Sequence, residues 1–232
     1  MGLFSGLFTK KRKYDHIVSL GNNCEFSFQF FTNYKFVDAN LFSWTYIMDR
    51  DKFLGCLEDI DGLLSEGLED PVPLYECKKY NVRYHGRAKW EDLMNLDGEL
   101  NREAVDEDKK EIYSRVEHLK EKFKKMLVDD KSKLFVLKDP KDTDFVIAVK
   151  LILDKIVKGR YDLLVVVTKD EFDKFKLLQA DNIFVRAINN YSPETAVTSK
   201  KQSDMNGWKK IFSEFAPKLV KSKNKKFKFE EV

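Results

Sequence analysis

LLVVV at residues 163–167 is an unbroken run of Leu and Val, the pattern of a strand that is buried on both faces in a parallel sheet. Shorter apolar runs, LFVL at 134–137 and IFV at 183–185, lie on either side of it in the chain. The segments between these runs, 145–157 and 170–178, repeat apolar residues at helical spacing. Because this alternation favours right-handed βαβ units, the sequence predicts an α/β fold: an open, mostly parallel sheet with helices on both faces, in three Rossmann-like layers.

A second informative stretch lies near the start of the chain, where residues 14–31 read YDHIVSLGNNCEFSFQFF. Its apolar run stops at GNN, and Gly and Asn suit both a tight turn and a helix N-cap. If a helix begins at Cys24, the unpaired N–H groups and the dipole of its first turn favour the thiolate, which is the nucleophile. Residues 25–30 also alternate polar and apolar side chains, which is equally typical of a hairpin strand in which Cys24 has no activation.

Three motifs follow one another in the first third of the chain: SLGNNCEF at 19–26, LFSW at 41–44 and YNVRYH at 80–85. In this order they resemble a bacterial family of unknown function that is described as papain-like cysteine peptidases. Its members have Ser-Leu-Gly, two variable residues and Cys, then Asp or Arg before a Trp, then a downstream His. Ser43 replaces that Asp or Arg here, so no polar role carries over to it. The resemblance implies strand, turn and helix for residues 16–31.

The Gly-Asn-Cys core is also similar to a capsule-biosynthesis acyltransferase family with an SGNH-hydrolase-like α/β fold, a Cys/His pair and a coenzyme A site. This resemblance implies Cys24 as the nucleophile, His85 as its base and acyl-CoA as a donor, with no other cofactor. In SGNH-like enzymes a late Asp-x-x-His motif supplies the base. The same spacing from Asp204 reaches Gly207, so we expect Asp204 to be a helix cap rather than a catalyst.

We therefore expect a cysteine-dependent acyl-transfer enzyme, an acyltransferase or esterase whose acceptor is a surface polysaccharide, another glycan or a small molecule. Cys24 would attack a carbonyl carbon, His85 would take the thiol proton, and N–H groups of the turn would hold the oxyanion. The turn residues are Gly21, Asn22, Asn23 and Glu25. Weaker candidates for substrate binding are Trp44, Lys138, Thr168, Asn190 and Asp204. Most of these follow predicted strands, where open α/β sheets bind ligands. The residue that orients the base is not visible, and Asp204 and Glu25 are the candidates for it.

Three other hypotheses stay open. A papain-like peptidase fits the first resemblance, but its antiparallel barrel is not what the βαβ pattern predicts. A non-catalytic α/β module of glycan biosynthesis or of a membrane surface would only bury Cys24. A nucleotide-sugar-binding enzyme would be protected by nucleotide-sugars and not by acyl-CoA.

Composition narrows the classes of function further. Lys and Arg total 42 and Asp and Glu total 39, a formal net charge of +3, which gives no case for nucleic-acid binding. The cysteines Cys24, Cys56 and Cys77 form no CxxC pair, and there are only three histidines, so we expect no metal site. GxGxxG after a strand, P-loop, HExxH and GxSxG motifs are lacking, which weakens the oxidoreductase, NTPase, zinc-protease and serine-hydrolase hypotheses.

The 232 residues are enough for one α/β domain, which we place at 14–216, with a polar loop or lid inserted at about 87–108. Residues 1–13 join an apolar segment to KKRK, and residues 217–232 form a lysine-rich tail. Such basic tails can bind an anionic membrane surface. The sequence therefore predicts a cytoplasmic protein that can associate peripherally with the inner membrane face.

Overall fold

A four-stranded parallel sheet forms the centre of the protein. The computed structural model describes residues 11–35, 39–193 and 201–218. Its central strands are β2 (His16–Ser19), β6 (Lys133–Lys138), β7 (Tyr161–Thr168) and β8 (Ile183–Ile188), hydrogen-bonded in that order. In β7 the first seven residues are buried, as expected for a strand that is covered on both faces. The predicted α/β fold with a parallel sheet is confirmed.

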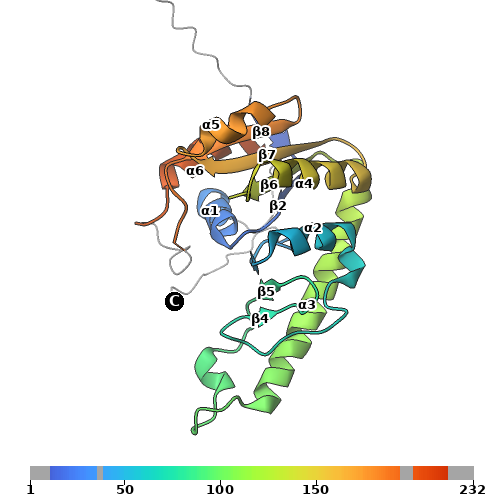
Figure 1. Ribbon diagram of the computed structural model, residues 1–232, viewed down its shortest axis with the longest axis vertical. Helices are drawn as coiled ribbons and strands as arrows, with labels where there is room; N and C mark the ends of the chain where they lie inside the picture. Colours follow the sequence, from blue (N-terminus) through green and yellow to red (C-terminus); the bar gives the residue numbers. More distant parts are fainter. Residues whose placement is uncertain (1–10, 36–38, 194–200, 219–232) are drawn as a thin grey trace, which may run out of the picture.

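Helices cover both faces of this sheet, which makes three layers (Figure 1). On one face lie α1 (Glu25–Tyr34) and α6 (Met205–Glu214), and on the other lie α2 (Arg50–Glu58), α4 (Thr143–Ile156) and part of α3 (Arg102–Val128). Alternate β7 side chains feed the two cores: Leu164 and Val166 pack on the α1 side, whereas Leu163 and Val165 pack on the α4 side. The segment predicted as a helix at 170–178 is the short α5 (Phe172–Phe175) followed by the 3₁₀ turn η3 (Lys176–Leu178).

A second, antiparallel sheet lies between α1 and β6 in the chain. Its strands are β3 (Thr45–Ile47), β5 (Val82–Tyr84) and β4 (Tyr75–Glu76), in that order across the sheet. In Figure 1 this sheet stands beside α3, away from the parallel sheet. Two 3₁₀ turns, η1 (Ile60–Gly62) and η2 (Trp90–Leu93), connect its strands to their neighbours. We call β3, residues 59–101 and the first half of α3 the insertion.

The polar stretch predicted as a loop at 87–108 is partly helical, and this corrects the expectation. It contains η2, and α3 already begins at Arg102. The helix starts there because the Asn101 side chain accepts a hydrogen bond from the Ala104 N–H at 3.2 Å.

Arg12 and Lys13, which the sequence assigned to the N-terminal tail, belong to a strand. β1 (Arg12–Tyr14) pairs in parallel with β9 (Phe215–Pro217). Tyr14 holds β1 in place because its ring is 1% exposed and its hydroxyl donates to Asp162 Oδ2 at 2.6 Å. Pro217, which was assigned to the C-terminal tail, likewise belongs to a strand, and Lys218 donates from Nζ to Asp15 Oδ2 at 2.6 Å. Tail residues 1–10 and 219–232 lie outside the described residues. Within the described part of the chain no helix has the length and apolar character to cross a membrane.

Candidate active site

The strand, turn and helix expected around Cys24 are present. β2 ends at Ser19, α1 begins at Glu25, and Cys24 is the residue immediately before the helix. Asn23 acts as the side-chain cap, because its Oδ1 accepts a hydrogen bond from the Glu25 N–H at 3.0 Å. The hairpin alternative is therefore wrong: residues 25–34 form a helix that places Cys24 beyond the carboxyl end of β2.

Gly21 lets the chain make this turn. Its φ of +82° lies in the left-handed region, and a Cβ on it would collide with Cδ1 of Ile47 in β3. The Ile47 N–H also donates to the Asn22 carbonyl at 3.0 Å. The turn after β2 therefore packs directly against β3, the edge strand of the antiparallel sheet, and position 21 in this contact accommodates only glycine.

Gly21→Ala is expected to lower the free energy of unfolding by about 2–4 kcal/mol, from the backbone strain and the collision together. The matched control is Gly98→Ala, because Gly98 has a φ of +86° with nothing within 4 Å of an added Cβ, so only the strain of about 1–2 kcal/mol remains. Adding Ile47→Val to the Gly21→Ala variant removes Cδ1 and should restore part of the lost stability. Urea unfolding of the three variants measures this, and equal losses for Gly21 and Gly98 would contradict the contact.

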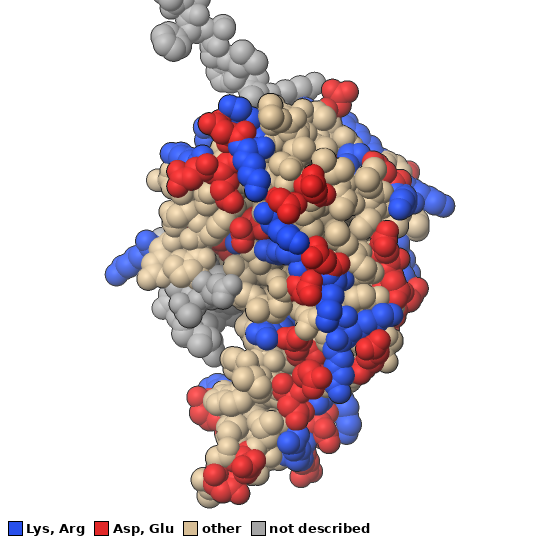
Figure 2. Space-filling view, viewed as in Figure 1, with Lys and Arg blue, Asp and Glu red and all other residues tan. Residues whose placement is uncertain are grey.

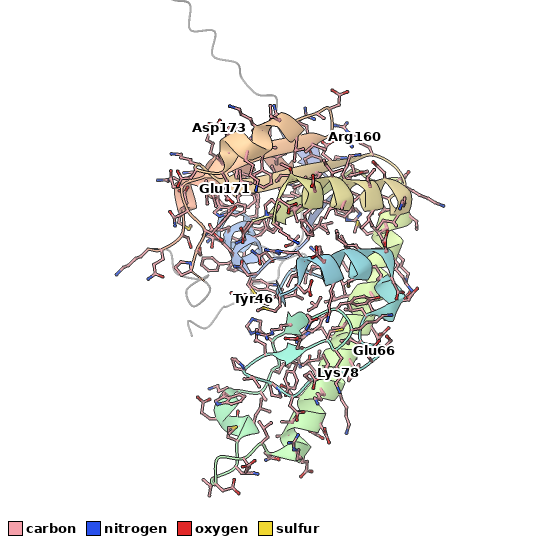
Figure 3. The ribbon with its side chains drawn as sticks, in the orientation of Figure 1. Tyr46, Glu66, Lys78, Arg160, Glu171 and Asp173 are labelled. Carbon is pink, nitrogen blue, oxygen red and sulfur yellow. The ribbon has the colours of Figure 1, made fainter. Side chains whose placement is uncertain are left out.

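His85 is delivered to Cys24 by the antiparallel sheet. It follows β5, whose Tyr84 pairs with Thr45 of β3. The imidazole Nε2 lies 3.7 Å from the Cys24 Sγ, although 61 residues separate the two in the chain. In Figure 3, Tyr46 in the middle of β3 marks the boundary between the insertion and the body that carries the parallel sheet. The structure thus brings together the two residues that were predicted as nucleophile and base.

Burial decides the protonation state of this pair. Cys24 is 4% exposed, and loss of solvation raises the pKa of its thiol to about 11. Partial desolvation by the surrounding protein and, secondarily, the nearby Arg115 guanidinium lower the pKa of His85 below its ordinary value, although part of its side chain is exposed. The expectation of a lowered thiol pKa at the helix start is therefore wrong, because desolvation outweighs the helix terminus. At neutral pH the pair consists of a thiol and a neutral imidazole, which can accept the thiol proton at Nε2.

Backbone N–H groups near the sulfur can serve as oxyanion donors. The N–H groups of Cys24, Phe26 and Ser27 make no hydrogen bond within the described residues, as is usual at the start of a helix. Of the turn residues that were expected to contribute, Glu25 donates its N–H to Asn23 Oδ1 and Gly21 donates its N–H to Ser19 Oγ. The N–H groups of Asn22 and Asn23 make no hydrogen bond within the described residues and stay candidate donors.

Two residues that sequence reasoning did not assign to the site fix the backbone around His85. Arg115 on α3 donates from Nη2 to the His85 carbonyl oxygen. Asp108, which precedes Arg115 on α3, accepts hydrogen bonds at Oδ1 from the N–H groups of Arg87 and Ala88, at 2.8 Å and 3.2 Å. Gly86 permits this approach, because a Cβ there would collide with Asp108 Oδ2. A carboxylate on the apolar stripe of a long helix is the sequence signal that could have revealed Asp108, which is 6% exposed.

A mostly apolar cavity of about 180 Å³ adjoins His85. Trp44, from the LFSW motif, lines it together with the Arg115 side chain and apolar groups such as Leu41 and Val116. Of the predicted substrate-binding residues, Trp44 is the one that this cavity places beside the base.

Glu25 and Lys138 form a buried ion pair behind the turn. Glu25 is 0% exposed and Lys138 is 1% exposed. Glu25 accepts hydrogen bonds from Lys138 Nζ at 3.0 Å and from Trp208 Nε1 at 3.1 Å. The Lys138 ammonium also lies 4.5 Å from the centre of the Tyr191 ring. The Lys138 ammonium is therefore engaged in a buried contact that joins α1 and α6 to the sheet, which corrects its assignment to substrate binding. The Glu25 carboxylate, which was a candidate for orienting His85, is occupied by the same contacts and does not orient it.

Lys138→Met is expected to lower the free energy of unfolding by about 3 kcal/mol, because it leaves the Glu25 carboxylate buried without its charge partner. Lys141→Met is the matched control: Lys141 pairs with Asp51 at 3.1 Å, but its side chain is 51% exposed, so a loss under about 1 kcal/mol is expected. Urea unfolding at neutral pH compares the two. A Lys138 loss as small as the Lys141 loss would show that the buried pair is not needed.

The remaining predicted residues lie beyond the strands but are engaged elsewhere. Asp204 caps α6 by accepting the Gly207 N–H at 2.9 Å, as expected, and also accepts the Asn189 N–H at 2.6 Å. The Thr168 hydroxyl donates to Glu171 Oε2 at 2.9 Å. Asn190 is exposed and donates to the carbonyls of Tyr191 and Gln202. The Asn22 amide donates to the Asp139 carboxylate. None of these contacts brings Asp204 to His85, so it is not the orienting residue.

In the described ranges, no three His, Cys, Asp or Glu side chains gather in a way that could hold a metal ion. None of the family models, curated proteins or solved structures compared with the chain matches it.

Proposed function

We propose that the protein is a cysteine-dependent acyl-transfer enzyme, an acyltransferase or esterase. The observation that carries the proposal is the distance of 3.7 Å between Cys24 Sγ and His85 Nε2, which is within the reach expected for a nucleophile and its base in an unliganded enzyme. The position of Cys24, at the start of a helix beyond the carboxyl end of a parallel strand, supports it further.

The arrangement supports general-base activation rather than a preformed ion pair. The Cys24 Sγ attacks the carbonyl carbon of an ester or thioester while His85 Nε2 takes the thiol proton. The carbonyl oxygen gains negative charge, which the N–H groups of Cys24, Phe26 and Ser27 stabilise. The imidazolium then returns the proton to the leaving alcohol or thiol, and an acyl-cysteine remains. An acceptor hydroxyl or water, deprotonated by His85, releases the acyl group and regenerates the thiol.

The acceptor that we propose is a glycan hydroxyl or a small-molecule alcohol, with acyl-CoA as the donor. Both follow the resemblance of the Cys24 motif to capsule-biosynthesis acyltransferases. The mostly apolar cavity beside His85 supports an acyl chain as the group that is held there. Peripheral association of the basic tails with an anionic membrane in the cytoplasm is part of the same proposal.

The burial of Cys24 favours one alternative, a non-catalytic α/β module in which the thiol only packs. The antiparallel sheet that carries His85 leaves the peptidase alternative open as well, with a peptide carbonyl in place of the ester. The two enzymatic candidates require a reactive Cys24, whereas the module does not.

Alkylation by iodoacetamide at neutral pH, followed by mass mapping, tests the proposal. We expect Cys24 to react before Cys56 and Cys77, because both of those are 0% exposed and, within the described residues, neither thiol is hydrogen-bonded to a histidine as Cys24 is. His85→Gln should slow alkylation of Cys24 alone, since the base that removes its proton is lost. Equal rates at the three cysteines, or no change in His85→Gln, would contradict the proposal and leave the module.

A further inference from the structure

A cationic groove lies along the outer edge of the parallel sheet. It has a volume of about 560 Å³ and runs between β1 and the first half of the edge strand β8. Five basic side chains line it, together with a single carboxylate: Lys11, Arg12, Lys13, Arg160, Arg186 and Glu214. Its volume is in the usual range for sites that bind small molecules, about 300–1,000 Å³.

The basic charge of this groove is not neutralised by its own walls. Arg186 is paired with Glu214, to which its Nε donates at 2.8 Å. Arg12 and Arg160 share the carboxylate of Asp162 at long distances, 3.7 Å and 3.9 Å. That same Asp162 oxygen already accepts the Tyr14 hydroxyl at 2.6 Å.

Lys11 and Lys13 have no ion pair or hydrogen bond from their side chains within the described ranges. Five cations therefore face two carboxylates, Glu214 on the wall and Asp162 beneath it.

Arg12 is held with its donors available. Its guanidinium lies 4.2 Å from the centre of the Phe184 ring, and stacking on a ring leaves the N–H edge of a guanidinium free for oxygen acceptors. The Arg186 guanidinium, however, already donates to Glu214, Gln179 Oε1 and the Val185 carbonyl. By contrast, on the face seen in Figure 2, basic and acidic side chains are interleaved. The groove is thus a separated and partly preorganised concentration of positive charge.

We propose that this groove binds a diphosphate group, either on a soluble ligand or on a lipid headgroup. Arg12 lies in β1 and Arg160 directly precedes β7, and both line the groove. Planar guanidinium groups suit paired phosphate oxygens. Lys11 and Lys13 add charge at the rim.

The diphosphate site is separate from the Cys24 site. Arg160, labelled in Figure 3, directly precedes β7, whereas Cys24 follows the carboxyl end of the parallel strand β2. The eight residues of β7 correspond to about 26 Å between the two ends of the sheet. A test of diphosphate binding can therefore succeed or fail independently of the acyl-transfer proposal.

Binding of inorganic pyrophosphate to the full chain, measured by titration calorimetry, tests the proposal. We expect saturable 1:1 binding that Arg12→Gln/Arg160→Gln weakens at least tenfold, since each lost charge-assisted contact is worth about a tenfold factor or more. The matched control, Lys89→Gln/Lys110→Gln, removes two exposed basic residues of the insertion and should leave the affinity within twofold. Absent or non-saturable binding, or equal weakening in both double variants, would overturn the proposal.

A second variant guards against misfolding of the arginine mutant. Lys11→Gln/Lys13→Gln removes side chains that make no ion pair in the described residues, so it should melt like the parent while weakening pyrophosphate binding several-fold. Unchanged affinity in this folded variant would also count against the groove.

Vesicle sedimentation then distinguishes the two sources of the diphosphate. Vesicles of phosphatidylcholine with a polyprenyl diphosphate lipid, whose headgroup is a diphosphate, are compared with phosphatidylcholine alone. Sedimentation that depends on the diphosphate lipid, that pyrophosphate displaces and that Arg12→Gln/Arg160→Gln lacks supports a headgroup. Pyrophosphate binding without sedimentation supports a soluble diphosphate.

Discussion

Replacing Cys24 with alanine is expected to lower the rate of acyl transfer by about 10⁴-fold or more, because it removes the sulfur atom that we propose as the nucleophile. The measurement uses p-nitrophenyl acetate or a short-chain thioester as the acyl donor. Intact-protein mass spectrometry should show one acetyl group on the parent chain, mapped to Cys24, and none on Cys24→Ala. The loss corresponds to about 5 kcal/mol of transition-state stabilisation.

Cys77→Ala is the matched control for this variant. Cys77 is also buried, at 0% exposure, so its loss tests whether any cavity in a core is enough to abolish the reaction. We expect Cys77→Ala to lose about 1 kcal/mol of stability and to keep its acylation rate. Acylation that persists in Cys24→Ala, or that is lost equally in both variants, would refute the nucleophile assignment.

His85→Gln is expected to lower kcat/KM by about 10²–10⁴-fold, since the general base disappears while the side chain keeps a similar size. The pH profile separates this role from packing. As the proposed base, the imidazole works only when neutral, and partial desolvation with the nearby Arg115 charge lowers the pKa of His85 from 6.5. Activity should therefore fall on acidification, with the midpoint of this acid limb below 6.5.

This acid limb should be missing in His85→Gln. His118→Gln, which changes an exposed histidine on α3, should retain both the rate and the limb. An acid limb that stays in His85→Gln, or one centred above 6.5 in the parent, would exclude His85 as the base.

The parallel sheet was predictable from the chain because β7 and its neighbours carry their own signal. A run such as 163–167 has no polar face, so burial on both sides follows from local sequence. The strands β1 and β9 gave no such signal. Arg12 and Lys13 look like a solvated tail, and only the pairing of residues about 200 positions apart makes them a strand.

The ambiguity at residues 25–30 has a simple origin. Phe26, Phe28 and Phe30 alternate with polar residues, which mimics a strand, but Phe26 and Phe30 are also four residues apart and face the same core in α1. A period of two contains the helical spacing of four. Local pattern alone therefore could not separate the two structures.

The pair of Cys24 and His85 was found from a motif, whereas its electrostatics were not. Dipole arguments use only the position of a residue in its helix, and they predicted a stabilised thiolate. How much protein surrounds the sulfur depends on the whole fold, and that burial raises the pKa of the Cys24 thiol to about 11. The partnership of Glu25 with Lys138, 113 residues away, was hidden for the same reason.

α3 has a mechanical consequence for the pair. The helix has 27 residues, about 40 Å of rod, and it runs from the insertion to the strand that neighbours β2 (Figure 1). Cys24 and His85 therefore lie in two parts of the fold that α3 connects. Because the Asn22–Ile47 hydrogen bond and the contact of Gly21 with Ile47 join these two parts close to the sulfur, a tilt of α3 would have to break them before it could separate Cys24 Sγ from His85 Nε2.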